Sequence, residues 1–212
     1  MNMDTILFDL DGTLIDTNEL IIASFQHTFK HYGMAITREQ TIEFIGPPLN
    51  ESFASLVPAE QVAAMIDTYR EHNLLHHDDY VTAFPHVVET IKQLKEHGLK
   101  LGIVTTKRFQ SVEKGVKLTA LEPFFDVTIT LDDVTHAKPH PEPVIMAMKR
   151  LGAQRESTLM VGDNSHDIEA GQHAGVQTAA VAWSLKGREK MLEYNPTYIL
   201  DDIRDLLTII GV

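Results

Sequence analysis

The sequence predicts an α/β protein, with a doubly wound parallel sheet as its core and an α-helical cap domain inserted into it. Four short apolar segments have the length and composition of buried parallel strands: Thr5–Phe8, Lys100–Val104, Ser157–Val161 and Gln177–Val181. Strands that alternate with helices are typical of a parallel sheet covered on both faces. Residues 16–83 break this alternation directly after the first strand, because they show helical patterns and almost no strand pattern.

The remaining core elements follow the strands in order. Weaker strand candidates are Val127–Thr130 and Thr197–Ile199. Five segments between or after the strands have helical patterns, and the right-handed crossovers they imply would place them on the two faces of the sheet. These segments are Val87–His97, Gln110–Lys117, Glu142–Leu151, His166–His173 and Asp201–Ile209.

The inserted segment contains its own helix signals. Capping-box patterns predict two helix starts: Asp16 with Glu19, and Thr37 with Gln40. Gly46-Pro47-Pro48 predicts a break, and Val62–Leu75 predicts another amphipathic helix. We therefore predict two domains, a core of residues 1–15 and 84–212 and a helical cap of residues 16–83.

Composition and charge exclude several classes of function. Hydrophobic residues make up 43% of the 212, enough for a packed core, and the absence of cysteine excludes disulfides and thiolate chemistry. The cysteine-free composition fits a cytoplasmic enzyme, and neither a signal peptide nor a membrane span is expected. A formal net charge of −12 disfavours nucleic-acid binding, so a small anionic substrate would need local cations or a metal.

Two acidic side chains follow the first predicted strand. In open α/β sheets ligands bind beyond the carboxyl ends of the strands, where Asp9 and Asp11 would lie. Neighbouring carboxylates repel each other and call for a cation, and hard oxygen ligands favour Mg²⁺. Gly12 permits a sharp turn or a close approach of the backbone to a ligand. Alone, this pattern fits two solvated acids in a turn equally well.

Three further groups decide between these interpretations. Thr105, Thr106 and Lys107 follow the second strong strand; Asp163 follows the third, with Asp167 four residues later; and Lys138 precedes a helix. Each group alone has a structural explanation, as a strand-end threonine, helix-capping acids or a solvated loop lysine. Together they supply the nucleophile, second acid, hydroxyl, cation and metal carboxylates that phosphoryl transfer needs.

With these motifs in this order, the whole chain resembles the haloacid dehalogenase (HAD) superfamily. The resemblance implies a Rossmann-like HAD core, a cap of the helical type and Mg²⁺-dependent phosphohydrolysis through an aspartyl phosphate. Carried onto this sequence, it implies Asp9 as nucleophile, Asp11 as general acid and base, Thr105 as a hydrogen-bond donor to the phosphoryl group and Lys138 as its cation. It implies metal binding by the Asp9 carboxylate, the Asp11 carbonyl and Asp163, with Asp167 acting indirectly.

The substrate is less clear from the core motifs. For substrate binding we select Gly12, Thr106, Lys107, the loop at Gly46 and the cap cation Arg70, ahead of Lys30 and Arg38. Segments such as FIGPPL, LGIVTTK and LDDVTHAKPHPEPV are similar to bacterial pyrophosphatases of this family. That similarity implies hydrolysis of inorganic pyrophosphate and a functional link to HPr serine-phosphate dephosphorylation. A phosphatase for phosphoglycolate or another small phosphomonoester, a β-phosphoglucomutase and a receiver domain remain alternatives.

The histidines and the tryptophan are assigned to structure. His27 and His31 have a metal-compatible spacing, but a solvated helix face is expected. The segment His76–Asp79 is interpreted as the linker that closes the cap. Trp183, after the fourth strong strand, is expected to pack rather than to bind substrate.

Overall fold

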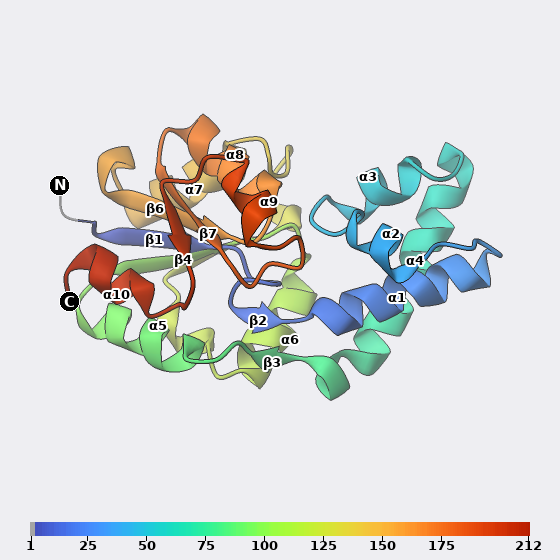
Figure 1. Cartoon of the computed structure of the whole chain (residues 1–212), viewed down its shortest axis with the longest axis horizontal. Coiled ribbons are helices and arrows are strands. Elements are labelled where there is room, and N and C mark those ends of the chain that lie inside the picture. Colours follow the sequence, from blue (N-terminus) through green and yellow to red (C-terminus); the bar gives the residue numbers. More distant parts are fainter. Residues whose placement is uncertain (1–2) are drawn as a thin grey trace.

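Six parallel strands form the central sheet of the computed structural model, which describes residues 3–212 (Figure 1). In spatial order they are β5 (Val127–Ile129), β4 (Lys100–Val104), β1 (Thr5–Phe8), β6 (Thr158–Gly162), β7 (Gln177–Val181) and β8 (Tyr198–Leu200). All neighbours pair in parallel. The predicted fold class is confirmed, and β1 lies in the middle of the sheet between β4 and β6.

Alternate residues of β1 pack on opposite faces of this sheet. Ile6 and Phe8 belong to an apolar cluster with residues of helices on one face, whereas Leu7 packs with residues of helices on the other face. The whole strand is buried, which explains its continuous apolar sequence. The helices of the sheet region are α5 (Val87–Glu96), α6 (Phe109–Leu118), α7 (Glu142–Leu151), α8 (Ser165–Ala174), α9 (Arg188–Leu192) and α10 (Asp205–Ile210). Three short 3₁₀ helices are η1 (Glu122–Phe124), η2 (Leu131–Asp133) and η3 (Arg155–Ser157).

Helix α10 begins four residues later than the sequence pattern predicts. The Asp205 carboxylate accepts the backbone N–H groups of Asp201 and Asp202 at 2.9 and 3.0 Å. These bonds hold Asp201 and Asp202 in a turn before the helix, because the Asp205 side chain accepts their backbone N–H groups. Helix α9 was not predicted, and β6 and β8 each begin one residue later than expected.

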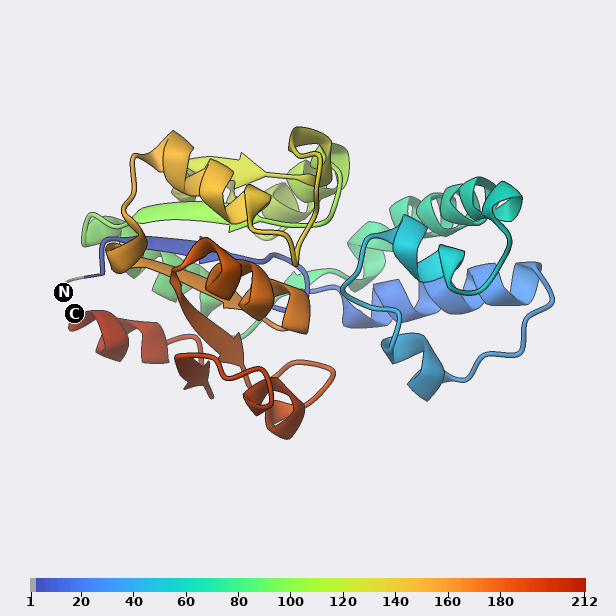
Figure 2. The same cartoon turned by 90° about the horizontal axis from the view of Figure 1, so that it is seen from above.

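The helices of residues 16–83 form a separate group at one end of the molecule, as Figure 2 shows, with α10 at the opposite end. They are α1 (Asn18–His31), α2 (Arg38–Ile42), α3 (Leu49–Ala54) and α4 (Ala59–Tyr80). Their apolar cluster, which includes Phe25, Phe29, Phe53 and Met65, is distinct from the two clusters against the sheet. Phe25 lies 5.4 and 4.9 Å from the ring centres of Phe53 and Tyr69, so aromatic packing joins α1, α3 and α4.

A two-stranded antiparallel ribbon connects this group to the sheet region. Its strands are β2 (Ile15–Asp16) and β3 (Thr82–Ala83), which lie between the two parts in Figure 1. Two residues per strand are too few for a periodic signal, so the sequence did not predict the ribbon. The predicted division into residues 1–15 with 84–212 and residues 16–83 stays a prediction, and the separate clusters and the ribbon at its boundaries support it.

Two helix starts and a linker are predicted in the inserted segment. The capping box of Thr37 and Gln40 is confirmed. The one assigned to Asp16 and Glu19 is wrong, because Asp16 pairs in β2 and Thr17 becomes the N-cap residue of α1. Glu19 instead forms an ion pair with Arg38 at the surface. The segment His76–Asp79 lies inside the last turns of α4 rather than in a linker.

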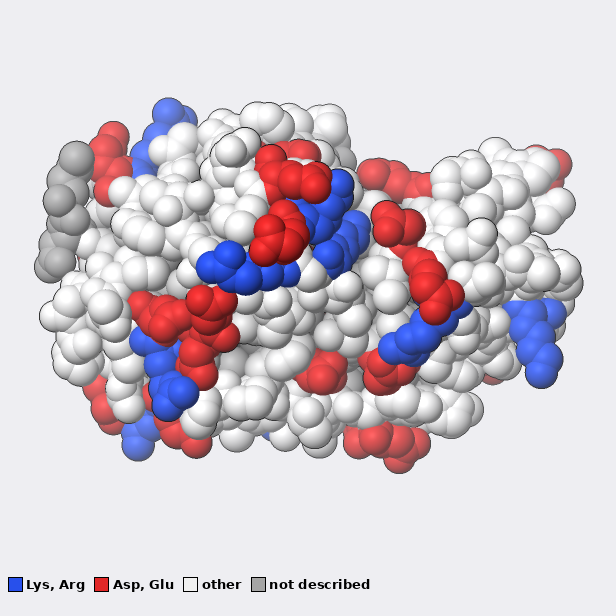
Figure 3. Space-filling model, in the orientation of Figure 1, with Lys and Arg blue, Asp and Glu red and all other residues white. Residues whose placement is uncertain are grey.

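On the face shown in Figure 3, acidic and basic side chains occur in small interleaved groups. His27 and His31 are exposed on α1, as expected for a solvated face. Trp183 packs against Phe84, with ring centres 6.0 Å apart, which fits its predicted structural role. Within residues 3–212, no helix combines the length and the apolar composition that crossing a membrane would require.

Candidate active site

The carboxyl ends of β1, β4 and β6 bring the predicted groups together. Because these strands are parallel neighbours, Asp9, Thr105 and Asp163 lie at one edge of the sheet. This edge opens into a cavity of about 930 Å³ between the sheet and the helices α1, α3 and α4. Ten predicted site residues line the cavity: Asp9, Asp11, Gly46, Arg70, Thr105, Thr106, Lys107, Lys138, Asp163 and Asp167.

Gly12 does not line the cavity, yet the structure requires a glycine there. Its φ is +78°, and a Cβ atom would lie 2.3 Å from Asp163 Oδ2. Glycine therefore lets the turn after β1 approach the Asp163 carboxylate closely. The predicted contact of Gly12 with substrate stays a prediction.

The Lys138 ammonium group connects the acids at the centre of the site. It donates to Asp9 Oδ1 at 2.7 Å, to Asp167 Oδ1 at 2.6 Å and to the Val104 carbonyl at 2.8 Å. An ammonium group has three protons, so all are used. Burial alone lowers the pKa of Lys138, but the charges and hydrogen bonds of Asp167 and Asp9 outweigh burial and raise it. Lys138 is thus a permanently charged, fully bonded group.

The acids are more numerous than the cations near them. Carboxylate oxygens of Asp9, Asp163 and Asp167 lie within 4.8 Å of one another. Burial raises the pKa of Asp9 to about 7; the Lys138 charge opposes this shift, while the charges of Asp167 and Asp11 add to it. Burial, together with the charges of Asp167 and Asp9, also raises the pKa of Asp163 well above its ordinary value. The site therefore holds negative charge that its own cations do not balance.

A divalent cation fits this charge and these donors. With all six groups ionised, the four carboxylates of Asp9, Asp11, Asp163 and Asp167 face the two ammonium groups of Lys107 and Lys138, a net charge of −2. One divalent ion would neutralise this charge, and carboxylate oxygens suit hard cations.

The hydrogen bonds distinguish the acids that could bind such an ion directly. Both Asp167 oxygens are engaged, one by Lys138 and the other by the Asn164 backbone N–H at 3.0 Å. The Asp163 carboxylate has a single long contact, from the Thr13 hydroxyl at 3.5 Å. Asp9 and Asp163 are therefore the available ligands, whereas Asp167 holds Lys138 in place.

Asp11 lies apart from this cluster, on the side of the cavity next to the connecting ribbon. Its Oδ1 accepts hydrogen bonds from Lys107 Nζ at 2.5 Å and from the Thr17 hydroxyl at 2.7 Å. Thr17 directly follows β2 and occupies the N-cap position of α1. The carboxylate thus connects the loop after β4 with the start of the helical insertion.

The Thr105 hydroxyl can donate to an anion. It is buried at the end of β4, and its oxygen accepts the Lys107 backbone N–H at 3.2 Å. Since that bond occupies a lone pair, the hydroxyl proton stays available. Thr105 lines the same cavity as Asp9 and Lys138.

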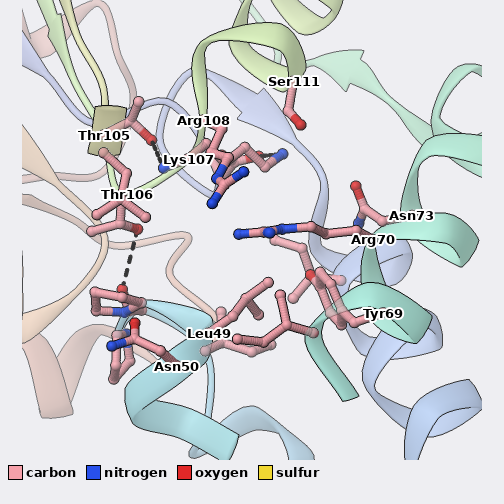
Figure 4. Close-up of a pocket in the computed structure, with 18 of the residues that line it drawn as sticks. Leu49, Asn50, Tyr69, Arg70, Asn73, Thr105, Thr106, Lys107, Arg108 and Ser111 are labelled. Carbon is pink, nitrogen blue, oxygen red and sulfur yellow. Dashed lines mark hydrogen bonds and ion pairs between the residues drawn. The ribbon is translucent and has the colours of Figure 1, made fainter. Parts of the chain in front are cut away.

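The loop at Gly46 lies directly against the core. Asn164 Nδ2 donates to the Ile45 carbonyl at 2.9 Å, and a Cβ on Gly46 would lie 2.2 Å from the same nitrogen. The Thr106 hydroxyl reaches the Gly46 carbonyl at 3.5 Å (Figure 4). Asn164 was not among the predicted site residues, although its position three residues before Asp167 forms a capping box for α8 that the sequence contains.

Two arginines, Arg70 and Arg108, line the cavity and form what we call its arginine wall. Arg70 extends from α4 and Arg108 precedes α6, and Figure 4 shows both guanidinium groups directed into the cavity toward each other. Burial and the neighbouring charge of Arg108 lower the pKa of Arg70. Neither Lys30 nor Arg38 lines the cavity, so of the three cap cations considered only Arg70 does. Polar residues that the sequence reasoning missed also line it, among them Asn18, Asn50, Tyr69, Asn73 and Ser111.

Comparisons with known proteins agree with this geometry. Residues 6–181 match the family model of haloacid dehalogenase-like hydrolases. The chain is 56% identical to the pyrophosphatase PpaX of Oceanobacillus iheyensis over 211 residues, covering all of this chain and 98% of that protein. It is likewise 56% identical to the pyrophosphatase PpaX of Anoxybacillus flavithermus, with coverage of 100% and 99%.

Solved structures show the same fold. A haloacid dehalogenase-like family protein from Streptococcus pneumoniae is 27% identical and superposes with a TM-score of 0.87, covering 98% of each chain. A haloacid dehalogenase-like hydrolase from Bacteroides fragilis is 28% identical with a TM-score of 0.90, covering 96% of this chain and 99% of that one. The chain therefore belongs to the haloacid dehalogenase-like hydrolases, among their phosphohydrolases.

Proposed function

We propose that this protein hydrolyses inorganic pyrophosphate to phosphate in a Mg²⁺-dependent reaction, through an aspartyl phosphate on Asp9. One observation carries the proposal: a buried carboxylate bonded to Lys138 lines the same cavity as Arg70 and Arg108, whose guanidinium groups are directed into it. The carboxylate and its lysine suit attack on phosphorus. The two guanidinium groups suit a substrate that carries charge at both of its ends.

In the first step an Asp9 oxygen forms a bond to phosphorus, and the bond from phosphorus to the bridging oxygen breaks. Asp11 gives its proton to the departing phosphate. In the second step Asp11 removes a proton from water, the water oxygen attacks the same phosphorus and the bond to Asp9 breaks. General acid–base assistance of this kind is worth roughly 10²–10⁴-fold in rate.

The neighbouring groups hold the phosphoryl group and its charge. Lys138 donates to the nucleophile at 2.7 Å and stays charged throughout, and the Thr105 hydroxyl donates to a phosphoryl oxygen. Asp9, Asp163 and the Asp11 backbone carbonyl would hold Mg²⁺, with Asp167 fixing Lys138. Bound there, Mg²⁺ neutralises charge between the carboxylate and the phosphoryl group.

The arginine wall favours pyrophosphate over a neutral leaving group. When one phosphoryl group is attacked at Asp9, the other extends into the cavity, where Arg70 and Arg108 can bind its oxygens in pairs. Lys107 provides a further ammonium group at the edge of the acidic cluster. Relatives of the same length and more than half identical carry the name pyrophosphatase, which supports this substrate. A cytoplasmic location and the link to HPr serine-phosphate dephosphorylation are part of the same proposal.

A substrate panel with Mg²⁺ tests it. Phosphate release is measured from pyrophosphate, phosphoglycolate and p-nitrophenyl phosphate at equal concentrations. We expect pyrophosphate to have the highest kcat/KM. A preference for phosphoglycolate would replace the proposal with a phosphoglycolate phosphatase, which shares the same core residues.

Substituting Arg70 tests the arginine wall separately. Arg70→Gln is expected to lower kcat/KM for pyrophosphate by about 10–100-fold, because a charge-assisted hydrogen bond to substrate is lost, and to change p-nitrophenyl phosphate hydrolysis far less. Arg38→Gln is the matched control, since Arg38 pairs with Glu19 at the surface and does not line the cavity. Equal losses for both substrates would contradict a role in binding the second phosphoryl group.

A further inference from the structure

The loop that carries Lys138 also holds a second group of potential metal ligands, on the outside of the molecule. His136, His140 and Glu142 each present a ligand atom, and these atoms lie within 4.8 Å of one another. His136 Nδ1 is 2.9 Å and His140 Nδ1 is 4.0 Å from Glu142 Oε2. None of the three residues lines the cavity at Asp9. The proposed hydrolysis makes no use of them.

These separations bracket those of a tetrahedral metal site. Zinc binds imidazole nitrogen and carboxylate oxygen at about 2.0–2.2 Å, which places neighbouring ligand atoms about 3.3 Å apart. The two imidazole rings lie with centres 4.6 Å apart and tilted by 33°. Small rotations of two exposed side chains would therefore bring both nitrogens to bonding distance of one ion.

The carboxylate is already fixed and ionised. Glu142 accepts the backbone N–H groups of Thr135 and His136 at 2.8 and 3.0 Å. These bonds and the His136 ring lower the pKa of Glu142, because each of them stabilises the charged carboxylate. Glu142 thus caps the loop, and both imidazoles lie beside it: His136 Nδ1 bonds to its carboxylate at 2.9 Å, and His140 Nδ1 accepts its backbone N–H at 3.2 Å. An ion bound through His140 Nδ1 would replace this second hydrogen bond.

The geometry points to a binding site for a divalent transition ion of the zinc type, formed by His136, His140 and Glu142 and separate from the divalent site at Asp9. Imidazole nitrogens suit Zn²⁺ and Co²⁺, whereas Mg²⁺ prefers an all-oxygen set, so the two sites select different ions. Three protein ligands leave one coordination position for water. The ligand side chains are 62%, 51% and 25% exposed, so the ion exchanges readily with solution.

The position of this site gives it a structural consequence. His136 and His140 flank Lys138 in the sequence, two residues away on either side. A bound ion would close a short chelate around the segment that holds the Lys138 ammonium group on Asp9 and Asp167. Binding therefore stabilises the folded loop and raises the unfolding temperature of the protein, because the unfolded chain lacks the preformed site.

Cobalt titration of the full chain tests the proposal. Co²⁺ is added in the presence of saturating Mg²⁺, and the visible d–d absorption of a four-coordinate cobalt ion is recorded. We expect one Co²⁺ to bind, and the double variant H136Q/H140Q to weaken its affinity by at least about tenfold. Glu142→Gln is expected to weaken it similarly, while Asp163→Asn leaves the signal unchanged.

The control variant is H27Q/H31Q. It removes two exposed histidines of α1 that are four residues apart, the same spacing as His136 and His140. It should retain the cobalt absorption and the rise of the unfolding temperature with Zn²⁺, and H136Q/H140Q should lose both. Cobalt absorption that persists in H136Q/H140Q, or that disappears in Asp163→Asn, would overturn the proposal. The unfolding temperature without added metal shows whether each variant is folded.

Discussion

Three oxygen atoms share the Lys138 ammonium group, and this sharing determines what the neighbouring acids can do. Asp167 uses both of its oxygens in fixed bonds, whereas Asp9 keeps one oxygen free for chemistry. Lys138 is 3% exposed, so the attraction acts with little screening by water. The proposed nucleophile, Asp9, is thus held by a cation at the lining of the cavity.

Asp9→Asn tests the nucleophile. The amide has the shape of the carboxylate but cannot form the ester with phosphorus, so activity should fall by at least about 10⁴-fold. Phosphate release and the unfolding temperature are both measured, and the unfolding temperature should not fall. Activity within tenfold of the parent would exclude Asp9 as the nucleophile. When the parent enzyme is quenched with acid during turnover, mass spectrometry should find phosphate on the peptide that contains Asp9.

The raised pKa of Asp9 has a consequence for stability when divalent ions are removed with a chelator. Its value of about 7 in the folded protein exceeds the ordinary 3.8, so between these values the folded state binds more protons than the unfolded state. The free energy of unfolding therefore falls as the pH rises from about 4 to 7. Unfolding temperatures in EDTA should decline over this range, and Mg²⁺ should restore stability most at the alkaline end.

Asp9→Asn provides the control for this pH dependence. It removes the titrating group, so its unfolding temperature in EDTA should decline less than that of the parent. A parent protein whose stability in EDTA rises over the same range, relative to the variant, would contradict the assignment.

At the scale of elements, the N-terminal end of α8 joins the acidic site to the cap. Asn164 caps this helix and also donates to the Ile45 carbonyl in the loop before α3. The adjacent Gly46 has a φ of +120° and leaves no room for a Cβ. Asn164 thus both caps α8 and anchors the loop before α3 to the core.

Two substitutions of Asn164 separate these roles. Asn164→Ala loses both the cap and the anchor, and should lower the free energy of unfolding by about 0.5–2 kcal/mol. Asn164→Ser keeps a capping oxygen but lacks the amide donor, so it should retain more of the stability. Both should raise KM, because the loop at Gly46 loses its bond to the core. Urea unfolding and steady-state kinetics measure the two effects; an unchanged KM in Asn164→Ser would refute the anchoring role.

On the scale of the whole molecule, the active cavity lies between two separately packed parts joined by the short ribbon of β2 and β3. The acids Asp9 and Asp163 come from the sheet region and Arg70 comes from α4, so both parts contribute to the lining of the cavity. We propose that the parts move about the ribbon during turnover, as insertions over a catalytic site commonly do.

Crosslinking tests this movement. The chain has no cysteine, so Asp67→Cys on α4 and Gln110→Cys on α6 introduce unique thiols at two exposed positions that line the cavity. Joining them with a short cleavable reagent should reduce turnover at least about tenfold, and cleavage should restore it, since product release needs the parts to separate. Each single-cysteine variant, treated identically, should stay active. Full turnover in the joined protein would show that no such movement is required.

Much of the fold was predictable because buried strands and helices have recognisable apolar patterns in the local sequence. The buried strands β1, β4 and β7 match their predicted bounds, as does α7, since each carries an unbroken or periodic apolar pattern. Failures occurred where a side chain replaced a backbone partner, as at Asp205 before α10, or where an element was too short for any period, as in β2 and β3.

The candidate site shows the same division between local and distant information. Residue types after the strand ends indicated phosphoryl transfer, because acids, a hydroxyl and a lysine there have a chemistry that needs no coordinates. Their pairing was beyond sequence, since Lys138 meets Asp9 across 129 positions and Asn164 meets Ile45 across 119. The sequence alone thus predicted the strands and the types of side chain at the candidate site. Only folding decided that Arg70 faces Arg108 and that Asp167 holds Lys138, because distant side chains meet through packing and not through any local pattern.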